Sequence, residues 1–140
     1  MQNYRNLLVW QKSHQLTLDV YAVTKTFPSY EQFGLTSQLR KASSSIPTNL
    51  AEGSGKLTNR EFRRFVNISF GSSNELEYEL LLAYDLNYLT EAEFIKLDAQ
   101  TNEVKRMLAG LINAISKKII ISGLCILAVI TSCYFLYYLV

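Results

Sequence analysis

A long stretch without charge at the end of the chain most constrains how it can fold. Residues 119–140 contain no Asp, Glu, Lys or Arg, and they directly follow Lys117 and Lys118. As an α-helix this stretch would extend about 33 Å, which is enough to cross the core of a bilayer. The sequence therefore predicts one domain over residues 1–118 and an apolar segment over residues 119–140, a candidate transmembrane helix.

This apolar segment has three interpretations. In the first it spans a membrane, with Tyr134, Tyr137 and Tyr138 near the outer interface. Lys117 and Lys118 at the inner end then favour a cytoplasmic domain anchored to the inner membrane. In the second it is a buried C-terminal helix or a plug inside an oligomer. In the third it is an incidental extension past the normal stop of the gene.

Apolar residues in the first 118 positions recur at helical spacing and predict four helices. Two of them have clear start signals, because Thr58 precedes Glu61 and Thr90 precedes Glu93 at capping-box spacing. A heptad pattern then continues to Ile115 and can run unbroken into the apolar segment. The sequence predicts an all-α, antiparallel up-down-up-down four-helix bundle with an apolar C-terminal helical tail. The expected helices are Leu7–Phe27, Leu35–Glu52, Thr58–Tyr88, and one that begins at Thr90.

Small residues and one proline are expected to shape the second and third helices. Pro47 cannot donate a backbone hydrogen bond to the Ser43 carbonyl, so it predicts a kink. The hydroxyls of residues 43–45, all serine, are expected to help satisfy the freed carbonyls. Residues 53–55, Gly-Ser-Gly, should end the second helix. Residues 71–73, Gly-Ser-Ser, should let a neighbouring helix approach closely.

No catalytic constellation is evident. His14 is the sole histidine, and both cysteines lie in the apolar segment, so residues 1–118 contain no nucleophile–base pair of the Cys–His type. Phosphate-binding glycine loops and Glu-x-x-His metal motifs are also missing. Glu75 and Glu79, one turn apart, can share a cation, although a solvated acidic face explains them better. The sequence predicts a protein that is not an enzyme and that needs no cofactor or metal.

Charge is distributed unevenly along the chain, although the net charge is only +2. The net charge is +4 between Thr36 and Val66, where six basic residues outnumber two acidic ones. It is −7 between Glu75 and Glu103, where eight acidic residues accompany one lysine. Arginines at a helix start oppose the helix dipole, which suggests contact with phosphates of RNA or DNA. Ion pairing between subunits is the alternative. The candidate binding residues are Arg40, Lys41, Lys56, Arg60, Arg63 and Arg64.

The run SIPTNLAEGSGK at residues 45–56, followed by EFRRF at 61–65, resembles bacterial four-helix bundle proteins encoded in 23S rRNA intervening sequences. The resemblance covers about residues 5–118. It implies a pentameric ring without enzymatic activity. It also implies similarity to the accessory protein of diversity-generating retroelements, which binds nucleic acid through a basic surface. All six candidate residues fall in the longer matching segments Gly34–Lys56 and Arg60–Leu89.

Other matching positions are expected to shape the second helix and its exit: Ser45, Pro47, Asn49, Glu52 and Gly53. Typical members of this family end near the position of Ile119, so the apolar segment is a departure from the pattern. In a pentamer, five such segments would gather as a membrane bundle or as a buried plug.

Overall fold

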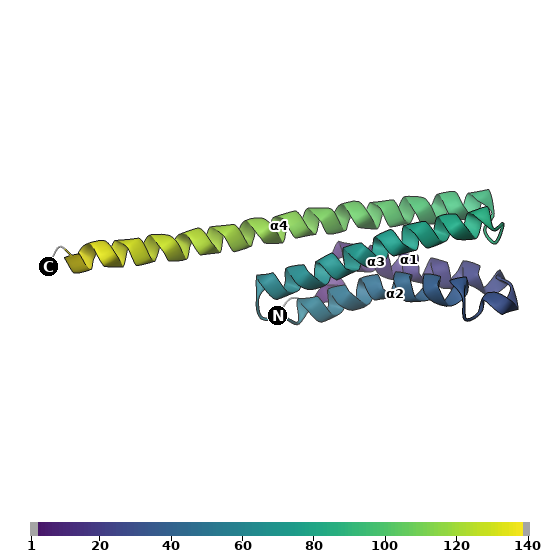
Figure 1. The fold of residues 1–140 in the computed structure, drawn as a ribbon, viewed down its shortest axis with the longest axis horizontal. Coiled ribbons are helices and arrows are strands. Elements are labelled where there is room, and N and C mark those ends of the chain that lie inside the picture. The colour runs from purple at the N-terminus through teal and green to yellow at the C-terminus, as the bar shows by residue number, and fades with distance from the viewer. Residues whose placement is uncertain (1–2, 139–140) are drawn as a thin grey trace.

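The computed structural model of the chain is built from helices, which confirms the predicted all-α class (Figure 1). It describes the backbone of residues 3–138 and the side chains of residues 3–124. The predicted interfacial tyrosines, Tyr134, Tyr137 and Tyr138, therefore lie outside the described side chains. The long helices are α1 (Leu8–Val23), α2 (Leu35–Ser54), α3 (Asn59–Asp85) and α4 (Glu91–Tyr138). Three short 3-10 helices are η1 (Tyr4–Asn6), η2 (Thr24–Thr26) and η3 (Ser29–Glu31).

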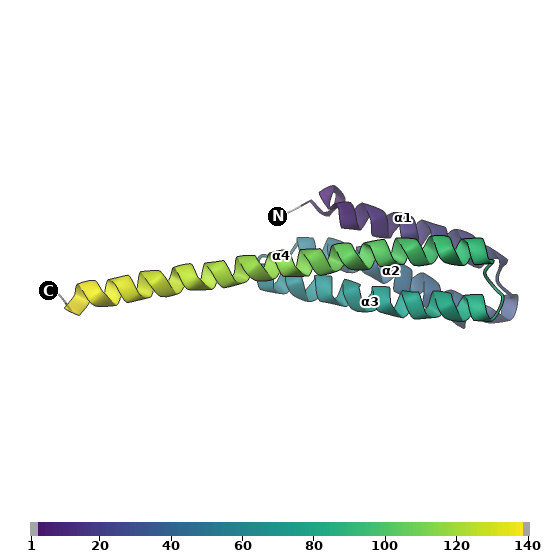
Figure 2. The ribbon, with the colours of Figure 1, turned by 90° about the horizontal axis from the view of Figure 1, so that it is seen from above.

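Consecutive long helices run antiparallel and pack side by side (Figures 1 and 2). α1 also packs against α4, which closes the bundle. α4 is far longer than its partners and continues past the bundle as a single straight helix (Figure 2). It leaves from the end where α2 stops and α3 begins, which we call the exit end. The helix has no break at residue 118, so the predicted continuation into the apolar segment is confirmed.

One hydrophobic core fills the space between the four helices. The heptad positions predicted for α4 supply part of it, since Leu97, Thr101, Val104, Leu108 and Ile115 are all buried. Burying these rows of apolar side chains supplies most of the driving force for folding. The largest fully buried side chains from the other helices are Leu16, Val20, Leu39, Ile46, Leu50, Val66, Leu76 and Leu80.

Pro47 lies inside α2, and a residue of a different helix satisfies the carbonyl that it frees. The Thr17 hydroxyl of α1 lies 2.9 Å from the Ser43 carbonyl and 2.9 Å from the Ser13 carbonyl of its own helix, so its single proton is shared between the two. The prediction that the serines at 43–45 would do this is wrong for all three, since the Ser45 hydroxyl pairs with Ser72 of α3. Ser43 and Ser44 donate instead to the carbonyls of Arg40 and Lys41, one turn earlier. A serine hydroxyl in a helix bonds the carbonyl of the residue three or four positions earlier. The hydroxyls of Ser43 and Ser44 therefore point away from the Ser43 carbonyl.

Further side chains attach the neighbouring carbonyls of α2 to the helices on either side. Trp10 Nε1 of α1 donates to the Pro47 carbonyl at 3.1 Å. Ser69 Oγ of α3 donates to the Ile46 carbonyl at 3.0 Å. Within α2, the amide of Asn49 donates to the Ser45 carbonyl at 2.9 Å. The bonds from Trp10 and Ser69 fix the register of α2 against α1 and α3 around Pro47, whereas the Asn49 bond acts within α2.

The predicted capping box at Thr90 forms completely, and the one at Thr58 forms in part, without the bond from the Thr58 amide to the Glu61 carboxylate. The backbone amides of Glu61 and Glu93 donate to the hydroxyls of Thr58 and Thr90, respectively. The Glu93 carboxylate also accepts from the Thr90 amide at 2.9 Å, which completes the reciprocal pair. The Glu61 carboxylate accepts from the Thr58 hydroxyl at 2.8 Å. The starts of α3 and α4 are thus determined locally.

Two helices end earlier than predicted. α1 stops at Val23 and continues as the 3-10 helix η2, rather than reaching Phe27. α3 stops at Asp85 rather than near Tyr88, because Asn87 adopts a positive φ of 58°. The Tyr88 amide then donates back to the Ala83 carbonyl at 2.9 Å, as in a C-terminal helix cap.

The small residues of α2 and α3 have different roles. α2 ends at Ser54 with Gly55 as its C-cap, which confirms that residues 53–55 end this helix, but Gly53 itself remains helical and is not the breaker. Instead, a Cβ at Gly53 would lie 2.6 Å from the Cβ of Phe65, so glycine permits close approach of α3. The close approach predicted for residues 71–73 comes from the buried serines and not from Gly71, which is exposed and has no heavy atom within 4 Å of such a Cβ. Ser72 makes the interhelical contact, at 2.9 Å from Ser45.

We expect Thr17→Val to destabilise the fold, although the side chain keeps its volume. The change removes the donor to the buried Ser43 carbonyl, which should lower the free energy of unfolding by about 1–3 kcal/mol. Urea unfolding of the full chain, followed by circular dichroism, measures this difference. Thr48→Val, at an exposed position of α2, serves as the control and should change stability by less than about 0.5 kcal/mol. Equal effects at the two positions would contradict the role given to Thr17.

Candidate nucleic-acid interface

Three arginines extend from the first two turns of α3. Arg60 and Arg64 are exposed, and Arg63 is half-buried. The capping box holds this part of α3 in helical form, so the three guanidinium groups start from a rigid backbone. None of the three forms an ion pair with a carboxylate among the described residues. Their charge therefore remains available for an external anion.

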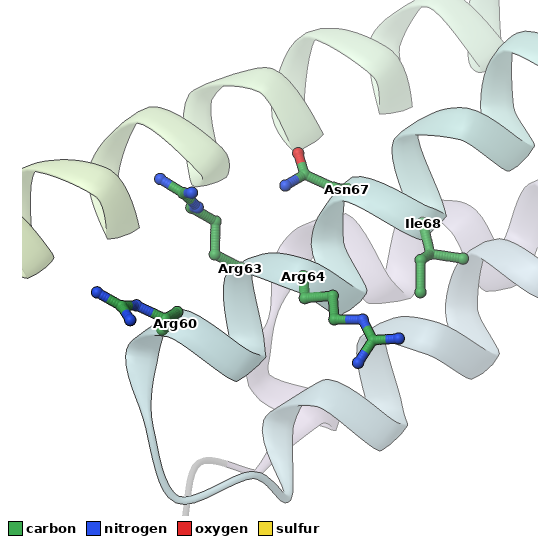
Figure 3. A pocket seen from close by; sticks show the side chains of 5 residues that line it. All are labelled: Arg60, Arg63, Arg64, Asn67 and Ile68. Atoms are coloured by element: carbon green, nitrogen blue, oxygen red, sulfur yellow. The ribbon is translucent and has the colours of Figure 1, made fainter.

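Figure 3 shows how these side chains are spread around α3. Arg63 extends toward α4, where its Nη1 donates to the Ser116 hydroxyl at 3.2 Å. Arg64 points away from α4, and Arg60 extends outward from the start of the helix. Together with Asn67 and Ile68 they line an open depression of about 460 Å³. Guanidinium and amide groups around an open surface suit the phosphate and sugar groups of a nucleic-acid backbone.

Arg40 and Lys41 do not belong to this cluster, contrary to the sequence-based grouping. Because α2 and α3 are antiparallel, Arg40 lies about 21 Å along α2 from the start of α3, at 1.5 Å per residue. Its Nε donates to the Thr24 hydroxyl at 2.9 Å, and its guanidinium lies 5.0 Å from the centre of the Tyr21 ring. Arg40 thus ties α2 to the end of α1, whereas Lys41 is exposed.

Lys56 lies in the connection just before α3, near the arginines. Its ammonium group lies 3.3 Å from the Glu52 carboxylate, one turn earlier, in a partly exposed ion pair. The same nitrogen lies 4.8 Å from the centre of the Phe65 ring. Lys56 therefore adds positive charge to the edge of the cluster, and Glu52 neutralises part of it.

α4 brings two further cations to the cluster, which sequence reasoning did not include in the site. The bond from Arg63 to Ser116 places the exposed Lys117 and Lys118 beside the start of α3. We call the set Lys56, Arg60, Arg63, Arg64, Lys117 and Lys118 the basic end. The sequence contained a signal for Lys117 and Lys118, because the heptad pattern of α4 reaches Ile115, directly before them. In an antiparallel pair, this part of α4 lies beside the start of α3.

The acidic residues that were considered for cation binding do not form a site. Among the residues that the structure describes, no cluster of three His, Cys, Asp or Glu side chains could hold a metal ion. Glu79 is buried, with 4 % exposure, so the interpretation as a solvated acidic face is wrong for this residue. Burial, with the nearby Glu75 carboxylate, raises the pKa of Glu79 from 4.5 to about 7. His14 is exposed and stacks on Trp10, with ring centres 5.1 Å apart.

Comparison with known proteins finds one family and similar solved structures. The family described as 23S rRNA-intervening sequence protein matches residues 5–110. A crystal structure of a protein of unknown function, from the S23 ribosomal protein family of Bacteroides thetaiotaomicron, superposes with a TM-score of 0.70 at 23 % sequence identity. The match covers 98 % of that protein and 75 % of this chain. None of the curated proteins compared with the chain matches it.

Glu79 should make the stability of the bundle depend on pH. The folded state retains the Glu79 proton up to about pH 7, whereas the unfolded chain loses it near pH 4.5. Stability should therefore fall as pH rises through this window, and then level off. Glu79→Gln should flatten this dependence and stabilise the protein at pH 8 by on the order of 1–3 kcal/mol. Urea unfolding measured from acid to alkaline pH tests this, and an unchanged pH profile in the variant would refute it.

Proposed function

Because the chain belongs to the family of 23S rRNA-intervening sequence proteins, we propose that it is a non-enzymatic, oligomeric protein that binds nucleic acid through its basic end. The observation that carries the proposal is the arginine triplet of α3, which surrounds an open depression and has no carboxylate partner among the described residues. In this proposal the guanidinium groups bind backbone phosphates, and α4 contributes Lys117 and Lys118. Such contacts position a nucleic acid without reading its sequence.

The position of the arginines supports binding over a purely structural role. Cations at a helix start are disfavoured by the helix dipole, so they cost some stability there. Only Arg63 is held by a neighbouring helix, through Ser116. Arg60 and Arg64 have no ion pair to compensate them among the described residues. The pairing alternative is weakened because several acidic residues are already used inside the chain: Glu77 pairs with Lys105, and Glu103 with Lys12.

Self-assembly is the second part of the proposal, and the family resemblance suggests a pentamer. Large apolar side chains remain exposed on the sides of the bundle, and burying them between subunits would favour association. They come from α1, α3 and α4, so more than one face is available. The residues are Leu18, Tyr21, Tyr78, Leu81 and Ile95.

Removing the arginine triplet should weaken nucleic-acid binding and its dependence on salt. We expect Arg60→Gln, Arg63→Gln and Arg64→Gln together to lower the affinity for a mixed-sequence single-stranded RNA by about tenfold or more. Each lost phosphate contact should also reduce the slope of log affinity against log salt by about 0.7. Fluorescence anisotropy with labelled RNA and the full-length protein, repeated with duplex DNA, measures both quantities.

The matched control is Arg106→Gln, which removes an exposed arginine of α4 outside the basic end. A second control, Arg40→Gln with Lys41→Gln, removes the two predicted residues that the structure separates from the cluster. Both controls should retain most of the affinity. If the arginine triplet variant binds as tightly as the original, or if the Arg40 and Lys41 variant loses as much, the site assignment is wrong.

A second candidate function, as a membrane-tethered interaction protein, is favoured by the extension of α4. The described part of α4 holds a stretch that is long and apolar enough to cross a membrane, and only 11 % of that stretch is buried. A core helix of a soluble bundle would be mostly buried. Residues 119–138 continue as helix beyond the bundle, which would let them span the bilayer with the bundle on one side.

Cell fractionation separates the tethered protein from a soluble one. We expect the full chain to sediment with membranes and to resist carbonate extraction, whereas a variant that ends at Lys118 should stay in the soluble fraction. The physical reason is the transfer of about 20 uncharged residues into lipid. Soluble behaviour of both proteins would exclude the anchor and leave nucleic-acid binding as the remaining proposal.

A further inference from the structure

The exit end of the bundle combines positive charge with exposed apolar side chains. Lys117 and Lys118 lie on α4 where it leaves the bundle, and Arg60 extends outward nearby. In the connection between α2 and α3, Leu57 is 98 % exposed, directly after Lys56. At this exposure the Leu57 side chain is not removed from water by any other part of this chain, so it does not stabilise the fold.

The helix register places Leu57 beside the start of the apolar segment. α3 and α4 are antiparallel, and their contacts pair Glu77 with Lys105 and Arg63 with Ser116. Leu57 itself lies two residues before α3, in the connection at the exit end. α4 leaves the bundle at this end, and beyond Lys118 it presents the apolar side chains of Ile120, Ile121 and Leu124, each about 60 % exposed. Leu57 and these side chains can therefore enter the same apolar layer.

The opposite end of the bundle has the opposite charge. Asp85, Glu91 and Glu93 surround the connection between α3 and α4, which lies farthest from the exit end (Figure 1). The bundle is therefore polarised along its long axis. Near an anionic surface, this distribution attracts the exit end and repels the far end.

We infer that the exit end docks on the surface of an anionic phospholipid bilayer. In this arrangement α4 passes into the bilayer, Lys56, Lys117 and Lys118 contact lipid phosphates, and Leu57 inserts into the interfacial layer. Basic residues beside a membrane helix are attracted to anionic lipids, and an exposed apolar side chain at this depth is removed from water. The bundle then stands upright on the membrane, with its acidic end directed away from it.

This inference rests on the membrane-tethered candidate and does not require nucleic-acid binding. Lys56, Lys117 and Lys118 also belong to the basic end, so in a docked bundle they would face lipid and the arginine triplet alone would bind nucleic acid. The RNA test uses that triplet, and the two proposals can therefore be separated. Arg63 and Arg64 emerge from the side of α3 (Figure 3), and Arg64 points away from α4, so that face remains accessible in a docked bundle.

A fluorescent probe at residue 57 of the full-length protein tests the docking. In a background of Cys125→Ala and Cys133→Ala, Leu57→Cys carries an environment-sensitive dye. The matched control is Phe33→Cys, because Phe33 is 91 % exposed in the connection between α1 and α2, at the far end. Each protein is incorporated into vesicles of phosphatidylcholine with phosphatidylglycerol, and into vesicles of phosphatidylcholine alone.

In anionic vesicles, we expect blue-shifted emission at residue 57 and a decrease of about twofold or more in quenching by acrylamide. The dye at residue 33 should remain in water. Both effects at residue 57 should diminish in neutral vesicles and in the variant Lys56→Gln, Lys117→Gln and Lys118→Gln. The control variant Lys25→Gln, Lys41→Gln and Arg106→Gln should behave like the original.

The outcomes distinguish the anchor from the docking. If the protein fails to float with vesicles of either kind, the anchor and the docking are both overturned. If it floats but residue 57 is quenched as strongly as residue 33, the anchor holds and the docking is overturned. If residue 57 is protected equally in both vesicles, the role of anionic lipid is overturned. Loss of RNA binding in the triple lysine variant, without change at residue 57, would assign these lysines to nucleic acid instead.

Discussion

The rest of the structure depends on how the carbonyls around Pro47 are satisfied. Proline removes a hydrogen bond from α2, and a buried carbonyl without a donor would be costly. Thr17 supplies the donor for the freed Ser43 carbonyl from α1. Trp10 of α1 and Ser69 of α3 donate in addition to the Pro47 and Ile46 carbonyls. These bonds fix α2 lengthwise between its neighbours, so its last turn meets α3 at Gly53, where no side chain could fit. The start of α3, and with it the arginine triplet, is positioned by this contact.

The same arrangement gives the bundle two chemically different ends. The basic end gathers cations from the α2–α3 connection, from the first turns of α3 and from α4 just before its apolar segment. Acidic residues accumulate where α3 passes into α4. This separation follows from the antiparallel topology, which brings the sequence around residue 60 beside the sequence around residue 117. An elongated molecule with one cationic end presents that end first to any polyanion, whether nucleic acid or an anionic membrane.

Local patterns in the sequence predicted most of the fold. The features that they missed depend on how one helix is aligned against another. Capping residues and helical spacing identified the starts of α3 and α4 and most core positions, because these depend on neighbours within one helix. The separation of Arg40 from Arg60 depends instead on the direction and register of packed helices. The helical spacing does place Glu79 on the buried face of α3, between Leu76 and Ala83, but its carboxylate favours a solvated interpretation because carboxylates are seldom fully buried. The donation from Thr17 to Ser43 joins residues 26 positions apart, beyond any periodicity argument.

The central claim is that the basic end receives nucleic acid. Ultraviolet crosslinking of the full chain to RNA in cells, followed by mass spectrometry of the crosslinked peptides, tests it most directly. The account predicts crosslinks within residues 56–68 and around Lys117 and Lys118. Crosslinks confined to the opposite region, around Arg40 and Lys41, or to the Trp10 and His14 face, would contradict it. A complete lack of crosslinked RNA would contradict it as well.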